Sequence, residues 1–210
     1  MKNTAEQIAA DLQQPEGRPG ESETSTRILD AALALYLEFG LRRTTMDDVA
    51  RQAGIGRVTV YRHYADKHAL FQAVVLRECG RAIRDIEARL AVIADMDERI
   101  VESFVLVVNG SRQHPLMRRL LDTEPEWLLP HLTIKGQALL DFGRGYIARY
   151  LRHAGVGKPG DDRVDIIAEV FMRILNSLLL TPGGVLAPDD DDVLRANARR
   201  FILPLFRTPA

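Results

Sequence analysis

The segment from residue 57 to residue 64, RVTVYRHY, carries side chains that suit DNA better than a protein core. Its arginines and histidine can bind phosphate oxygens, and its hydroxyl and aromatic groups can contact phosphates or thymine methyls. The planar fork of Arg57 also fits the O6 and N7 atoms of a guanine edge. We therefore predict a short helix that binds DNA. Two helices of an ordinary bundle are the alternative.

The residues before this segment predict a second short helix and a tight turn. Thr44 or Thr45 can cap the first helix, and Asp48, three residues past Thr45, is acidic at the position where a capping box has Glu or Gln. Gly54 is expected to end that helix in the left-handed conformation. Helix, glycine turn and helix together favour a helix-turn-helix unit.

Charge and composition limit how DNA can be bound. The chain has 210 residues and a formal net charge of -1, so bulk charge cannot coat nucleic acid. Between residues 41 and 81, eight arginines and lysines stand against four acids. Any DNA affinity must therefore come from this local, mildly basic segment.

The sequence does not support catalysis, metal binding or cofactor binding. The five histidines lack metal-ligand spacing, and HExxH, paired CxxC and phosphate-loop motifs are absent. We therefore expect no enzyme activity, metal site or cofactor. The single cysteine, Cys79, favours a reducing compartment and a buried thiol. Because no apolar run reaches about 18 residues, no membrane association is expected, and the location predicted is the cytoplasm.

Hydrophobic periodicity predicts helices along the rest of the chain. Residues 1–21 are expected to be a flexible arm. A helix over about 24–39 carries an apolar stripe, and we assign Phe39 and Tyr64 to the core of this N-terminal unit. Asp66 can cap a long helix that ends near residue 91. Further helices are expected at 97–113, 115–122, 125–153, 161–180 and 189–206.

The N-terminal quarter resembles the TetR-type transcriptional regulators of bacteria. The matching residues are Phe39-Gly40, Thr44-Thr45-Met46, Val49-Ala50, Ala53-Gly54, Thr59, Tyr61, Tyr64 and Lys67. The resemblance implies an all-α fold of about nine helices. Its N-terminal head would be a three-helix helix-turn-helix domain at 22–68, followed by a ligand-binding and dimerisation domain at 69–210.

The same resemblance implies which residues contact DNA. Thr45 and Lys67 match positions that touch phosphates, and the other candidates match the recognition helix. Two positions depart from the family pattern: Gly56 replaces a common serine cap, and Val58 replaces a small residue close to the DNA. The predicted DNA-binding residues are Thr45, Arg57, Val58, Thr59, Tyr61, Arg62, His63 and Lys67.

The resemblance also implies a homodimer through the helices at 161–180 and 189–206, and a pocket for a small-molecule effector. The predicted effector-binding residues are Phe104, Val108, Trp127, His131, Phe142, Tyr146, Phe171, Met172 and Asn176. The expected function is a repressor released from a palindromic operator by a small, largely apolar ligand. An activator or a ligand-independent regulator of the same family is the alternative, and a small-molecule-binding helical module without DNA binding is less favoured.

Overall fold

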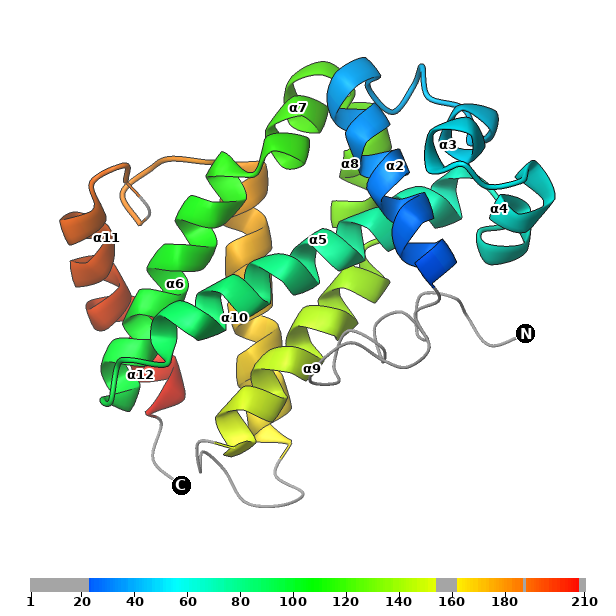
Figure 1. Ribbon diagram of the computed structural model, residues 1–210. Helices are drawn as coiled ribbons and strands as arrows, with labels where there is room; N and C mark the ends of the chain where they lie inside the picture. Colours follow the sequence, from blue (N-terminus) through cyan, green and yellow to red (C-terminus); the bar gives the residue numbers. More distant parts are fainter. Residues whose placement is uncertain (1–22, 154–161, 187, 208–210) are drawn as a thin grey trace. The chain divides into compact units, whose positions relative to one another are not determined.

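The computed structural model describes residues 23–153, 162–186 and 188–207, and the predicted N-terminal arm lies outside them. The described chain is built of helices (Figure 1), which confirms the predicted all-α class. It divides into two compact units. Of the described residues, unit 1 contains 23–81 and 115–138, and unit 2 contains 82–114, 139–153, 162–186 and 188–207. Among the described helices, none is long and apolar enough to cross a membrane.

Unit 1 begins with the three helices predicted for the head. These are α2 (Glu23–Phe39), α3 (Met46–Ala53) and α4 (Arg57–His63), and they are drawn in blue and cyan in Figure 1. The first part of α5 (Lys67–Leu90) follows. Unit 1 also contains α7 (Pro115–Thr123) and α8 (Pro125–Leu132), which the sequence had grouped with the ligand-binding domain.

Local sequence explains where the head helices start and stop. Thr45 and Asp48 form a reciprocal capping box at the start of α3, as predicted. Gly54 ends α3 with a φ of 63°, and its N–H donates to the carbonyls of Ala50 and Arg51. Asp66 caps α5 by accepting from the backbone N–H of Ala69 at 2.8 Å.

The core of unit 1 contains Tyr36, Val60 and Phe71, each with no exposed surface. Tyr64 is buried as predicted, and its hydroxyl lies 2.8 Å from that of Ser25. The assignment of Phe39 to the core is wrong, because 49% of its side chain is exposed. It is the last residue of α2, where the chain turns and no further helical turn covers the ring.

Glu124, between α7 and α8, fixes the turn that follows α2. Gly40 adopts a φ of 83°, and the backbone N–H groups of Leu41 and Arg42 donate to the two carboxylate oxygens of Glu124 at 2.6 and 3.0 Å. Successive N–H groups that point to one anion form a small backbone nest. Because the Glu124 carboxylate is buried, these hydrogen bonds replace its hydration.

Unit 2 contains the rest of α5 and the remaining helices. These are α6 (Met96–Gln113), most of α9 (Gln137–His153), α10 (Arg163–Leu180), α11 (Asp191–Asn197), a π-helical turn η1 (Ala198–Ile202) and α12 (Leu203–Phe206). The core packs Phe104 of α6 against Phe171 of α10, with ring centroids 6.0 Å apart.

Two predicted helices differ from the observed ones. The helical stretch expected at 125–153, which Pro130 could bend or restart, is two helices, α8 and α9, because the chain leaves helical geometry at Thr133. The last helix contains a π-helical turn between α11 and α12. Asp190 caps α11 by accepting from the backbone N–H groups of Asp192 and Val193.

Candidate DNA-binding interface

The outward face of α4 carries the residues predicted to read DNA. Arg57, Val58, Tyr61 and Arg62 are exposed, whereas Val60 is buried and anchors the helix to unit 1. Val58 is 83% exposed although it is aliphatic. Helix α4 contains no acidic residue. Thr59 and His63 are half-buried at the edges of this face. A positive, carboxylate-free helix with an exposed methyl-bearing side chain has the chemistry of a major-groove reader.

Arg57 is held by contacts from two helices. Its Nη1 donates to Oδ2 of Asp47 in α3 at 3.1 Å, and its Nε lies 3.0 Å from Oδ1 of the same carboxylate. The guanidinium carbon lies 5.4 Å from the ring centroid of Tyr61, one turn along α4. The structure thus brings Arg57, Tyr61 and Asp47 together, and the DNA contacts of Arg57 and Tyr61 stay predictions.

Thr45 lies at the start of α3, and its polar groups are already bonded. Its hydroxyl donates to Oδ2 of Asp48 at 2.6 Å, and its backbone N–H donates to the same oxygen at 3.0 Å. These hydrogen bonds lower the pKa of Asp48, because they stabilise the ionised carboxylate. Both donors of Thr45 therefore serve the capping box in the free protein, and its phosphate contact stays a prediction.

Lys67, at the start of α5, contacts groups of unit 1. Its Nζ donates to the carbonyl of Arg42 at 3.2 Å and lies 5.0 Å from the ring centroid of Trp127 in α8. Partial burial lowers the pKa of the Lys67 ammonium, and Glu124 opposes that shift. Neither the carbonyl nor the indole neutralises its charge. The phosphate contact of Lys67 stays a prediction.

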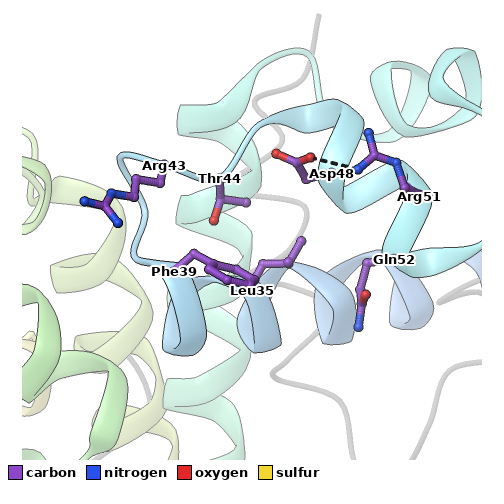
Figure 2. A pocket seen from close by; sticks show the side chains of 7 residues that line it. All are labelled: Leu35, Phe39, Arg43, Thr44, Asp48, Arg51 and Gln52. Carbon is purple, nitrogen blue, oxygen red and sulfur yellow. Dashed lines mark hydrogen bonds and ion pairs between the residues drawn. The ribbon is translucent and has the colours of Figure 1, made fainter.

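A surface hollow of about 450 Å³ opens beside the start of α3 (Figure 2). Phe39 and Leu35 from α2 line one part of it, and the ion pair between Asp48 and Arg51 lines another. Arg43, Thr44 and Gln52 complete the lining. None of the residues predicted to bind an effector lies in this hollow.

The predicted effector residues are divided between the two units. In unit 1, Trp127 stacks on His68 with ring centroids 4.6 Å apart, and His131 meets Phe71 edge-on at 5.4 Å. Burial lowers the pKa of His131, and His68 and Lys135 add to this effect. These rings pack against α5 of the same unit.

In unit 2, Phe104, Val108, Phe142 and Phe171 are buried. Tyr146 donates from its hydroxyl to Oε1 of Glu87 at 2.6 Å, and burial raises the pKa of this tyrosine. The remaining two lie half-buried on α10: Met172 fills the space that a Cβ would need at Gly143, and Asn176 follows one turn later. The effector contacts of this set stay a prediction.

The sequence did not identify the contacts of two acidic residues of unit 1, Asp47 and Glu124. Asp47 was given no partner, although it lies ten residues before Arg57 on the neighbouring helix. Glu124 bonds to a turn more than 80 residues away, for which local patterning carries no signal. Among the described residues, no group of three or more His, Cys, Asp or Glu side chains is arranged to hold a metal ion.

Comparison with known proteins finds a family match over the N-terminal residues that carry the candidate DNA-binding interface. Residues 28–74, which include most of α2, all of α3 and α4 and the start of α5, match the family model described as bacterial regulatory proteins, tetR family. Arg57, Asp47 and Lys67 all fall inside this match.

The similarity to individual proteins extends over most of the chain. The HTH-type transcriptional regulator Rv1255c of Mycobacterium tuberculosis is 30% identical over 187 residues, which are 88% of this chain and 85% of the relative. The regulator AlkX of the same organism is 26% identical over 180 residues, which are 84% of this chain and 82% of AlkX.

A solved structure shares the fold. The TetR family repressor AlkX of a Dietzia strain, which is implicated in biodegradation of n-alkanes, aligns with a TM-score of 0.70 at 23% identity, over 86% of this chain and 96% of that one. The same family is indicated by the residues that match the family model and by the relatives that align over most of the chain, and the exposed helix α4 fits it. This chain belongs to the TetR family of bacterial DNA-binding transcriptional regulators.

Proposed function

We propose that this regulator is a homodimeric repressor that binds a palindromic operator and is released by a small, largely apolar effector. The observation that carries the DNA contact is the exposed face of α4, with Arg57, Val58, Tyr61 and Arg62 pointing away from the core. In this proposal Arg57 binds a guanine edge, Val58 contacts a thymine methyl, and Tyr61 and Arg62 bind phosphates.

Exposed apolar residues of unit 2 support the dimer. Ile166 and Val170 lie four residues apart on α10, and Val193 and Phe201 lie on the last helix. Ile166 is 57% exposed and Phe201 is 53% exposed. A solvated helix face is normally polar, so these two apolar faces favour burial against a second copy of the chain. Two copies can present two α4 helices about 34–36 Å apart, in successive major grooves.

An effector releases the operator only if it binds the released conformation more tightly than the DNA-bound one. The apolar core around Phe104 and Phe171 supports an apolar effector rather than a charged one. This chemistry agrees with the association of the related Dietzia repressor with n-alkane biodegradation. The polar groups proposed to orient the ligand are Tyr146 and Asn176.

The operator test is selection of bound sequences from a random DNA pool with the full-length protein. The proposal expects an inverted repeat whose half-sites are separated by about one helical turn. Enrichment of a single asymmetric site, or no enrichment, would overturn the proposed mode of binding.

The dimer is tested by light scattering on Val170→Glu, with Val92→Glu as a matched control at an exposed valine outside the proposed interface. Val170→Glu should give monomers that bind the inverted repeat weakly, and Val92→Glu should remain dimeric and bind it normally. A monomeric wild type, or a dimeric Val170→Glu variant, would contradict the proposal.

Release is tested by fluorescence anisotropy of a labelled operator titrated with alkanes, fatty alcohols and fatty acids. An apolar compound that dissociates wild-type protein but not the Phe171→Trp variant supports the proposed site. Transcription in vitro separates the alternatives. A repressor lowers transcript from a promoter that carries the selected site, and an activator raises it.

A further inference from the structure

The side chain of Arg57 is braced before any DNA is present. Oδ2 of Asp47 accepts a hydrogen bond from Nη1 of Arg57, and Nε of Arg57 lies 3.0 Å from Oδ1 of the same carboxylate. The ring of Tyr61 lies 5.4 Å from the guanidinium carbon. The carboxylate comes from α3 and the ring from α4, so the two helices of the helix-turn-helix unit hold one arginine between them.

Such bracing matters because an arginine has several rotatable bonds. An unrestrained guanidinium loses conformational freedom when it binds a base, and it can also bond to neighbouring phosphates or to other bases. A guanidinium that is already oriented loses less freedom and reaches fewer alternatives. It has five N–H donors, so a carboxylate can occupy one side while the remaining donors stay available for O6 and N7 of guanine.

The position of Asp47 is unfavourable for affinity alone. Its side chain is about half exposed, on the same unit as the DNA-reading face. A carboxylate at this surface repels phosphates and cancels one positive charge of a mildly basic segment. Its removal should therefore strengthen binding to DNA of any sequence. In return, the contact between Asp47 and Arg57 favours selectivity between base sequences.

We infer that Asp47 is a positioning residue that sets the base preference of Arg57, at the expense of non-specific affinity. The inference rests on the proposed contact between Arg57 and a guanine edge. It makes base recognition a property of the pair formed by α3 and α4, and not of the recognition helix alone.

The test measures base preference at every operator position by selection from a random pool, with wild type and single variants. Arg57→Ala identifies the base pair that Arg57 reads. Asp47→Ala should lower the preference at that same pair by about tenfold, within the roughly 10–100-fold that a bidentate arginine contact confers. Asp47→Asn, which keeps one acceptor but loses the charge, should fall between Asp47→Ala and wild type. The double variant should match Arg57→Ala, because bracing has no effect without the arginine.

Asp48→Asn is the charge-matched control, since it removes one negative charge from the adjacent residue of α3 and does not contact Arg57. Both Asp47→Asn and Asp48→Asn should bind random DNA at least as tightly as wild type, and only the former should lose base preference. Circular dichroism melts check that each variant is folded.

Three results would overturn the inference. In the first, Asp47→Ala keeps full preference at the Arg57 pair. In the second, Asp48→Asn loses preference equally, which makes the effect one of charge. In the third, Asp47→Ala loses preference at a different pair, which makes Asp47 itself a base contact. An unchanged preference in Arg57→Ala would remove the proposed guanine contact as well, so the two failures are distinguishable.

Discussion

Glu124 binds the backbone of Leu41, with its carboxylate oxygen 2.6 Å from the amide nitrogen. A carboxylate from the α7–α8 junction thereby completes the turn that follows α2, next to the helix-turn-helix residues. The glycine before this turn leaves room for it, because a Cβ at Gly40 would lie 2.8 Å from Oε1 of Glu124. The turn and the acid fit each other, although they lie far apart in sequence.

Glu124→Ala is predicted to destabilise unit 1 by about 2–3 kcal/mol, since two backbone N–H groups lose a charged acceptor in a buried site. Chemical denaturation followed by circular dichroism measures the change. Gly40→Ala should be destabilising as well, because it adds a clashing Cβ at a φ of 83°. The double variant should lose less than the two single losses together. Full additivity would show that the two residues act independently.

Stability is predicted to depend on pH through His131. Burial, His68 and Lys135 lower the pKa of this imidazole below its ordinary value of 6.5 in the folded state. As pH falls below that value, the unfolded chain takes up the proton first, so the free energy of unfolding decreases until the lower folded pKa is reached. Urea denaturation at several pH values should show this loss in wild type and a smaller loss in His131→Gln. His153→Gln, at an exposed site, should behave like wild type; an identical pH profile for His131→Gln would refute the assignment.

Thr45→Ala is predicted to affect stability more than DNA affinity. Its hydroxyl caps α3 through Asp48, and loss of such a cap costs about 1 kcal/mol. We expect the Thr45→Ala variant to unfold at a lower temperature than wild type. Its operator affinity, measured at low temperature, should fall less than threefold. A large loss of affinity without loss of stability would instead assign the hydroxyl to a phosphate.

Lys67→Ala is predicted to weaken binding to all DNA sequences alike. Its ammonium bonds to a carbonyl and faces an indole, so its charge stays available to a phosphate. Each lost phosphate contact should reduce the slope of log affinity against log salt by about 0.9. Lys135→Ala, an exposed lysine of the same unit, is the control and should keep the wild-type slope. An unchanged slope in Lys67→Ala would limit this lysine to a structural role.

The sequence predicted most helices because their signals are local. The Thr45 cap, the Gly54 stop and the Asp66 cap each involve residues within a few positions of one another, and all three occur. The grouping of the first three helices into a DNA-binding head came from the resemblance to TetR-type regulators. The apolar stripe of α2 was extended one residue too far, to Phe39. Hydrophobic periodicity does not indicate at which residue the side chains of a helix cease to be buried by the rest of the protein.

The features that the sequence did not predict depend on tertiary contacts. Nothing near Glu124 in the sequence indicates a turn at residues 40–42 as its partner. The membership of 115–138 in unit 1 is equally invisible to a linear reading. Within the interface, the type of Arg57 suggested base contact, but its bracing by Asp47 required the angle between two helices. The base contact of Arg57 thus stays a prediction, and the sequence did not predict its ion pair with Asp47.

The inclusion of residues 115–138 in unit 1 has a consequence for protein engineering. A chimera that transplants only the first 80 or so residues onto another regulator of this family would leave the Leu41 and Arg42 amides facing an unrelated loop. Grafts that also carry α7 and α8 should express and fold better. Unit 1 is thus discontinuous along the gene, and recombination that preserves it has to exchange two segments at once.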